Sequence, residues 1–278
     1  MKKVISLFLL LIFYAQSAYA FNFAWINDDE KAVEKVLKAQ VKYANLMDFK
    51  NFIKTYDAKY LNSDGFNLDI YSSLIKDVWK TFDNIKYSID IKNIEVKDNK
   101  AVVELVETSF AEIELTKAYE GELKSEANSI YYLEKIDNIW KVVSDEVIDE
   151  TTSMLYGSAK NLDIKLTVPN KVEPDKDYCA TLEFEPPQKT IAIASIASDI
   201  VEYPQKPTKE VFRALPDDNI LERLFTSNNK NANEYVVASI GLTQADINNS
   251  NMNIKLTGFG YAIKRVNIIR EFKEGIND

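Results

Sequence analysis

The hydrophobic pattern of this 278-residue chain changes its period after Phe82, and that change constrains the fold more than any other feature. Before Phe82, apolar side chains recur three and four residues apart, which is the spacing of one face of an amphipathic helix. After it, Tyr87, Ile89 and Ile91 alternate with polar residues, as in a strand with one buried face. The pattern predicts helices followed by antiparallel strands, an α+β arrangement.

Three helices are expected before the change of period. Asn27 and Glu30 have the spacing of a capping box, so a helix is expected to begin there. Asp48 is expected to cap a second, shorter helix, and a third is expected to end at Phe82. The apolar stripe of the first helix consists of Val33, Val36, Leu37, Gln40, Val41, Ala44 and Met47.

Two hairpins are expected to follow the helices. Residues 86–110 contain two alternating runs separated by Asp98, Asn99 and Lys100, which are typical turn residues. Residues 127–148 contain two more runs joined by Asp137-Asn138. Four antiparallel strands are therefore predicted after the helices.

This order of elements resembles the superfamily of cone-shaped domains named after nuclear transport factor 2. The similar segments are the strand Tyr87–Val96, the turn and strand Asp98–Leu105, and the closing strand pair Tyr131–Val142, which ends in Trp-Lys-Val. The resemblance implies three helices on a curved antiparallel sheet over residues 27–150, with a pocket between the two layers. It also implies that this open sheet face can form a homodimer.

A second domain is expected after residue 150. Residues 151–161 are rich in Ser, Thr and Gly and are predicted to form a linker. Residues 162–271 contain short alternating runs separated by turns, which predicts an all-β sandwich that only loosely resembles immunoglobulin-type modules. Within this domain, residues 216–225 are expected to form a short helix whose Leu221, Leu224 and Phe225 pack inward.

The first twenty residues have the pattern of a cleavable export signal. Two lysines precede the apolar run Val4–Tyr14, and small residues precede the expected cleavage between Ala20 and Phe21. The alternative is a membrane anchor, but this run is much shorter than the roughly 20 residues that a spanning helix needs. We therefore expect a periplasmic or extracellular protein with no membrane anchor after cleavage.

Composition excludes several functions. The chain has no histidine and a single cysteine, Cys179, so triad catalysis through histidine, zinc sites and an internal disulfide are excluded. The formal net charge of −9 without a basic cluster argues against nucleic-acid binding. No calcium loop and no cofactor motif is present, so we expect neither a metal nor a cofactor.

Candidate site residues must then be carboxylates or tyrosines. Glu107 follows Val103 and Leu105 on one face of a strand, where an acid is either buried with a raised pKa or solvated at the end of the strand. Asp145 has the same two interpretations. Five aromatic side chains are candidates for lining an apolar pocket, the alternative being ordinary core: Tyr43, Tyr56, Tyr87, Tyr131 and Trp140.

Three functions remain open on the sequence alone. The first is non-catalytic binding of a small apolar ligand or a protein partner by an exported protein. The second is an enzyme of the isomerase or dehydratase type that uses Glu107 or Asp145 as a base on a small apolar molecule. The third is a purely structural role as a homodimer. The absence of paired catalytic groups favours binding over catalysis.

Overall fold

A computed structural model describes residues 28–116, 119–206, 208–230, 232–248 and 251–269. The expected export signal, with Ala20 and Phe21, lies outside these residues. Within these ranges, no helix combines the length and the apolar character that crossing a membrane requires.

The helical layer consists of α2 (Asp28–Asn45), α3 (Phe49–Phe52) and α4 (Leu68–Thr81), with a 3-10 turn, η2 (Ile53–Thr55), after α3. The expected cap of the second helix is confirmed, because the Asp48 side chain accepts from the backbone N–H of Asn51 at 3.2 Å. Asn67 caps α4 in the same way. Helix α2 buries four members of its predicted stripe: Val33, Leu37, Gln40 and Ala44.

Two long hairpins follow, and both predicted turns are confirmed. Strands β1 (Lys86–Lys97) and β2 (Lys100–Thr116) close on the pair Lys97 and Lys100, and β3 (Tyr119–Ile136) and β4 (Ile139–Gly157) close on Ile136 and Ile139. Asp137 and Asn138 both adopt positive φ angles, of 50° and 62°. A two-residue hairpin turn needs this backbone geometry, and Asn and Asp tolerate it well.

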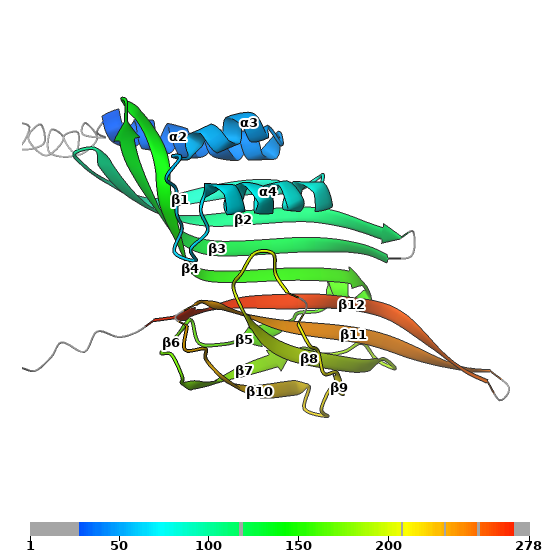
Figure 1. The fold of residues 1–278 in the computed structure, drawn as a ribbon. Coiled ribbons are helices and arrows are strands. Elements are labelled where there is room, and N and C mark those ends of the chain that lie inside the picture. The colour runs from blue at the N-terminus through cyan, green and yellow to red at the C-terminus, as the bar shows by residue number, and fades with distance from the viewer. Residues whose placement is uncertain (1–27, 117–118, 207, 231, 249–250, 270–278) are drawn as a thin grey trace, which may run out of the picture.

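The expected fold class, a three-helix cone domain followed by a separate sandwich, is wrong. One nine-stranded sheet runs through both halves of the chain, in the order β1-β2-β3-β4-β12-β11-β8-β9, with β6 attached to β12 (Figure 1). The added strands are β6 (Lys171–Val172), β8 (Ile191–Ile200), β9 (Arg213–Ala214), β11 (Glu234–Asn248) and β12 (Asn251–Ile268). The last part of the chain therefore extends the first sheet.

The expectation of two separate domains is wrong because residues 151–161, the expected linker, mostly continue a strand of the sheet. Strand β4 continues through Thr151 to Gly157, and only Ser158–Asn161 leaves the sheet as the 3-10 turn η3. This part of β4 pairs with β12, from Lys264 opposite Thr151 to Gly258 opposite Gly157. An unpaired edge of this length would leave backbone groups open to other chains, and β12 satisfies them.

Three short strands form a second, smaller sheet: β5 (Lys165–Thr167), β7 (Asp177–Glu183) and β10 (Ile220–Thr226), in the order β10-β7-β5. The helix expected over residues 216–225 is wrong, because β10 occupies most of this segment and pairs with β7. Leu224, expected to pack inward, is 68% exposed. Opposite it in β7 lies Cys179, an exposed free thiol.

The two layers that cover the large sheet lie on opposite faces. Tyr235 and Arg265 face each other across β11 and β12 and point toward the helical side, where both line a cavity. The next residues along, Val236 and Val266, belong to the core that the small sheet covers. Successive side chains of a strand point to opposite faces, so the helices and the small sheet have the large sheet between them (Figure 1).

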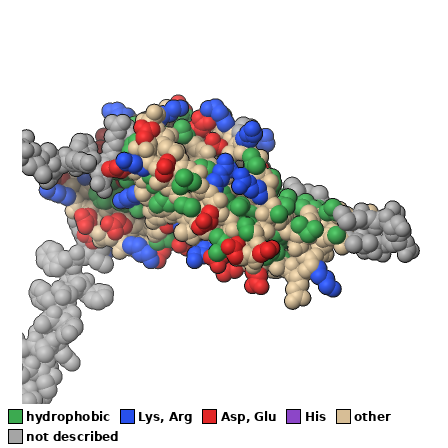
Figure 2. All heavy atoms as spheres, turned by 90° about the horizontal axis from the view of Figure 1, so that it is seen from below, with side chains coloured by type: hydrophobic (Ala, Val, Ile, Leu, Met, Phe, Trp, Pro, Cys, Tyr) green, Lys and Arg blue, Asp and Glu red, His purple; other side chains and the backbone are tan. Residues whose placement is uncertain are grey.

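Charged side chains of both signs are interspersed on the molecular face shown in Figure 2, with apolar side chains between them. The net charge of −9 is therefore not concentrated into one acidic patch on this face.

Candidate functional site

A cavity of about 400 Å³ lies between the helical layer and the large sheet. Side chains from α2, α3, α4, the loop before α4 and six strands line it, including β11 and β12. Most of the wall is apolar or aromatic, and the rest consists of hydroxyl, amide and charged side chains. The carboxyl and guanidinium groups on the wall are those of Asp64, Glu107, Asp145, Glu150 and Arg265.

Two of these carboxyl groups flank a small residue on the sheet. Ala127 of β3 is paired with Glu107 of β2 on one side and with Glu150 of β4 on the other. Directly paired residues have their Cβ atoms about 4.5–5.5 Å apart and point to the same face. The methyl group of Ala127 therefore forms a low floor between two acidic walls.

A β-bulge explains why Glu150 faces the cavity. In β4, Asp149 is opposite Asn128 and Val147 is opposite Ser129, so Ile148 is an extra residue. In a regular strand Asp145 and Glu150, five residues apart, would point to opposite faces. The extra residue reverses the alternation, and both side chains line the cavity.

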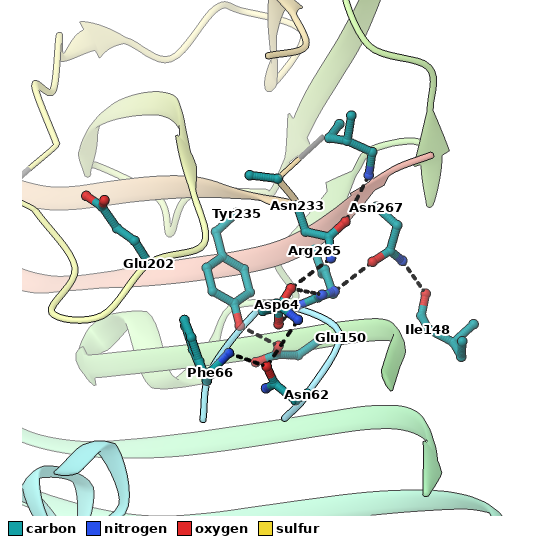
Figure 3. Close-up of polar contacts among 12 residues, drawn as sticks. Asn62, Asp64, Phe66, Ile148, Glu150, Glu202, Asn233, Tyr235, Arg265 and Asn267 are labelled. Carbon is teal, nitrogen blue, oxygen red and sulfur yellow. Dashed lines mark hydrogen bonds and ion pairs between the residues drawn. The ribbon is translucent and has the colours of Figure 1, made fainter. Parts of the chain in front are cut away.

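The bulge is held from the neighbouring strand. Asn267 of β12 donates from Nδ2 to the carbonyl oxygen of Ile148 at 2.8 Å and accepts at Oδ1 from Nε of Arg265 at 2.8 Å (Figure 3). A buried carbonyl without a partner is costly, so this side chain stabilises the bulged conformation.

Three of the four acids on the wall, Glu107, Asp145 and Glu150, receive hydrogen bonds from hydroxyl groups. Glu107 accepts from Tyr131 at 2.7 Å and from Ser129 at 3.0 Å. Glu150 accepts from Tyr235 at 2.9 Å and from Thr152 at 3.2 Å. Asp145 accepts a hydrogen bond from the Tyr60 hydroxyl, which the fold buries.

None of the ion pairs formed by the described residues includes Glu107, Asp145 or Glu150. The loss of hydration on burial is therefore the main influence on the pKa values of these three carboxyl groups. Burial raises the pKa of Asp145 to about 7, against the lowering effect of the Tyr60 hydrogen bond. Burial also raises the pKa of Glu107 and that of Glu150, again against their hydroxyl partners. These groups consequently hold protons more readily than ordinary carboxylates.

Among the residues that the structure describes, Arg265 supplies the single guanidinium on the cavity wall, and it already has a partner. Arg265 donates from Nη1 and Nη2 to the two carboxylate oxygens of Asp64, at 3.0 and 2.5 Å, and the side chains are 1% and 7% exposed (Figure 3). Asn233 of the loop before β11 also donates to Asp64, at 2.7 Å. This pair joins the loop before α4 to β12 at one end of the cavity.

That loop is also held against β4 by its backbone. The N–H groups of Asp57, Leu61 and Ser63 donate to the carbonyl oxygens of Val142, Val143 and Asp145 respectively. The loop therefore lies beside the strand that carries Asp145, and its Asp64 and Phe66 reach the cavity wall.

Five residues predicted from the sequence line this cavity: Glu107, Asp145, Tyr56, Tyr87 and Tyr131. The alternative placement of Glu107 at a solvated strand end does not occur, because β2 continues to Thr116. Trp140 lies outside the cavity wall and donates to Asp29 at 3.2 Å, and Tyr43 is a half-buried member of the first core.

Sequence reasoning missed the residues that complete the site: Tyr60, Asp64, Tyr71, Glu150, Tyr235 and Arg265. Tyr71 lies in α4, where its spacing is that of an ordinary core residue of an amphipathic helix. Tyr60 contacts Asp145 from the loop before α4, and the others reach the cavity through that loop, a bulge or the pairing of β4 with β12. None of these features has a local signal in the sequence.

A second hollow, of about 630 Å³, lies on the opposite face of strands β1 to β4, because its Lys86, Thr108 and Lys124 alternate along the strands with the residues that face the cavity. Its wall is rich in Ser and Thr and includes Lys86 and Lys124. Tyr87, Ser88, Thr108, Ser109 and Ser125 border both hollows, which the sheet separates.

Among the described residues, no three Asp, Glu or Cys side chains converge in a way that could hold a metal ion. The acids of the cavity are instead spread along its wall, where Glu107, Asp145 and Glu150 have hydroxyl partners and Asp64 is paired with Arg265. What they can do chemically is accept hydrogen bonds, hold a proton or face a positive charge.

No family model matches the chain, and no curated protein matches it. Solved structures match part of it. A putative dehydratase of the NTF2-like family from Streptomyces avermitilis is 12% identical over 44% of this chain and 96% of its own, with a TM-score of 0.36. A cystatin-like protein of unknown function from Nostoc punctiforme is 13% identical over 44% of this chain and 90% of its own, with a TM-score of 0.33.

Bd1075 of Bdellovibrio bacteriovorus is 13% identical, with a TM-score of 0.36. The match covers 42% of this chain and 39% of that protein, so well under half of Bd1075 is represented. At such TM-scores these likenesses carry no functional argument, and the proposals below rest on the chain's own geometry.

Proposed function

We propose that this protein binds a small, largely apolar molecule in the cavity between its helices and its sheet. The observation that carries the proposal is a cavity of about 400 Å³ with aromatic walls and three carboxyl groups, Glu107, Asp145 and Glu150, facing into it. Ligand pockets typically occupy about 300–1,000 Å³ and combine apolar walls with a few placed polar groups.

The aromatic wall is preorganised. Tyr56, Tyr60 and Tyr71 contact one another with ring centroids 5.0 to 5.3 Å apart, and Tyr56 donates to the Tyr71 hydroxyl at 3.0 Å. Phe52 lies against Tyr56 and Trp79, with centroids 5.5 Å from each. Such interlocked rings lose little conformational freedom when a ligand enters.

Gln40 of α2 supplies a separate observation. It is 7% exposed and lines the cavity, and its Nε2 has no hydrogen-bond partner. Leaving a buried donor unpaired costs about 1–3 kcal/mol. A molecule in the cavity with an acceptor group near Gln40 would recover part of that free energy.

The test uses 2-phenylethanol, a small apolar alcohol, titrated into the isotopically labelled protein and followed by NMR. We expect saturable shifts concentrated at cavity residues such as Tyr71, Ala127 and Val147. Ala127→Leu raises the floor between Glu107 and Glu150 and should weaken binding by roughly tenfold or more.

The matched control is Asn128→Leu, which adds a similar side chain at the next, exposed position of β3. It should leave the affinity unchanged. Absence of saturable shifts at the cavity, or equal binding by both variants, would contradict the proposal.

A second candidate is proton-transfer catalysis with Asp145 as the base. A pKa of about 7 is well suited to a general base at neutral pH, and the Tyr60 hydroxyl fixes the orientation of the carboxyl group. In such a step Asp145 takes a proton from a carbon beside a carbonyl, and the electron pair of the broken C–H bond moves onto the oxygen as an enolate.

Deuterium uptake by phenylacetone in D2O tests this second candidate. The protein should accelerate exchange beside the carbonyl, and Asp145→Asn should abolish the acceleration. Exchange no faster than in buffer, while 2-phenylethanol still binds, would leave binding without catalysis.

A further inference from the structure

Building on the proposed binding function, we propose that the molecule this cavity recognises is an organic cation, with an ammonium group facing the carboxyl groups of Glu107, Asp145 and Glu150 and an apolar body against the aromatic wall. The inference names the ligand class, and it can fail while the binding function stands.

The first argument is charge balance in the cavity. Five ionisable side chains other than tyrosine line it, four of them acids: Asp64, Glu107, Asp145 and Glu150. The fifth, Arg265, is engaged by Asp64 through two hydrogen bonds. Three carboxyl groups therefore face the cavity without a cationic partner of their own among the described residues, and a buried carboxylate is strongly disfavoured unless a cation pairs with it.

The hydroxyl partners do not replace that cation. Tyr131 and Ser129 orient Glu107, Tyr235 and Thr152 orient Glu150, and each is a neutral donor. They hold the oxygens in place, yet the raised pKa values show that the charge remains undercompensated. A ligand ammonium group supplies both the charge and further donors to these oriented oxygens.

The second argument is the aromatic character of the cavity wall, and it does not depend on the carboxyl groups. Phe52, Tyr56, Tyr71, Trp79 and Tyr87 all line the cavity, and tyrosine and tryptophan faces attract cations through their ring quadrupoles. Aromatic faces with carboxylates nearby form a recurring type of site for ammonium groups. An apolar body on the same ligand buries against these rings.

An anionic ligand meets the opposite environment. Arg265 can bind it only by giving up Asp64, and the remaining acids would repel it. Lys86 and Lys124 line the second hollow, on the opposite face of the sheet, and not the cavity. An anion is therefore held, if at all, outside the carboxyl-lined space.

The experiment compares three probes that share a phenyl ring and a short side chain: 2-phenylethylamine, 2-phenylethanol and phenylacetate. Affinities are measured by NMR titration of the full chain at about pH 8, above the pKa of Asp145 and with the amine still protonated. We expect the amine to bind roughly tenfold or more tightly than the alcohol, and phenylacetate to produce no saturable shifts at cavity residues.

Two variants on β2 separate the cavity acid from general surface charge. Glu107→Gln removes one facing carboxylate and should reduce the preference of the amine over the alcohol by about fivefold. Glu104→Gln removes an exposed carboxylate from the same strand and should leave the preference unchanged. Because Gln keeps the size of Glu and removes a buried charge, Glu107→Gln should remain folded.

The outcomes are distinguishable. Equal affinity for amine and alcohol at the cavity overturns the cation inference and leaves the binding function intact. A preference that survives Glu107→Gln, Asp145→Asn and Glu150→Gln together also overturns it, because it then arises from charge outside the cavity. Failure of all three probes to shift cavity residues overturns both proposals.

Discussion

Arg265 and Asp64, 201 positions apart in the chain, form a doubly hydrogen-bonded ion pair that is almost fully buried. The pair connects β12, which extends the large sheet, to the loop that precedes α4 at the edge of the cavity. It is thus a direct link between the last part of the chain and the helical layer, and it also removes the cavity's one guanidinium from availability to a ligand.

Breaking this pair is expected to destabilise the protein strongly. Arg265→Met leaves a buried carboxylate without its cation, which should lower the free energy of unfolding by about 3–5 kcal/mol. The double variant with Asp64→Asn should recover much of that loss. Urea unfolding measures both, and Lys206→Met is the control, because the exposed pair of Lys206 with Glu202 should contribute less than about 1 kcal/mol. A double variant as unstable as the single one would contradict the pairing.

Stability should fall as the pH rises through the range in which Asp145 titrates. The folded state holds this proton up to a pKa of about 7, whereas the unfolded chain releases it near 3.8. The folded state therefore binds more protons between these values, and its stability is lost as the pH increases. A difference of about 3 units sets an upper limit of about 4 kcal/mol.

Asp145→Asn tests this dependence, because the amide keeps an acceptor for Tyr60 and cannot ionise. The variant should be as stable as the parent near about pH 4 and more stable by up to a few kcal/mol near about pH 8. Glu104→Gln, at an exposed position, should follow the parent at both pH values. Parallel curves for Asp145→Asn and the parent would show that Asp145 is not buried as described.

The bulge at Ile148 should depend on Asn267. Asn267→Ala removes the donor to the Ile148 carbonyl and the acceptor for Nε of Arg265, so a loss of about 1–3 kcal/mol is expected in urea unfolding. Asn253→Ala, at an exposed position of the same strand, should change stability by less than about 0.5 kcal/mol. Similar small effects at both positions would mean that the bulge does not need this contact.

The buried Nε2 of Gln40, which has no hydrogen-bond partner, is expected to lower the free energy of unfolding of the ligand-free protein. Gln40→Met replaces a buried, unpartnered amide by an apolar group of similar size and should raise the free energy of unfolding by about 1 kcal/mol. Lys35→Met, at an exposed position on α2, serves as the control and should be nearly neutral. Destabilisation by Gln40→Met would indicate that its amide has a partner after all.

The parts of the fold that sequence analysis predicted are local. Local sequence patterns predict features that depend on residues a few positions apart. Examples are the Asp48 cap, the apolar stripe of α2 and the hairpin turn at Asp137-Asn138. The same holds for Glu107, whose place on an apolar strand face follows from alternation with Val103 and Leu105.

The parts that were missed are non-local. The pairing of β4 with β12 joins residues about 100 positions apart, and the Ser- and Thr-rich end of β4 does not distinguish a linker from a polar strand. The bulge at Ile148 reverses the side-chain alternation, so regular alternation along the strand does not predict that Glu150 faces the cavity. Arg265 becomes a cavity residue only through that long-range pairing.

The most direct test of the central account is a carbon-13 NMR titration of the Asp145 carboxyl carbon, with and without 2-phenylethylamine. In the free protein we predict a midpoint near 7, and in the complex a midpoint lower by about 1 unit, because a cation beside the carboxylate favours ionisation. Saturating 2-phenylethanol should not lower it. A midpoint near the ordinary value of about 3.9, unaffected by the amine, would contradict a buried carboxyl group that faces a ligand cavity.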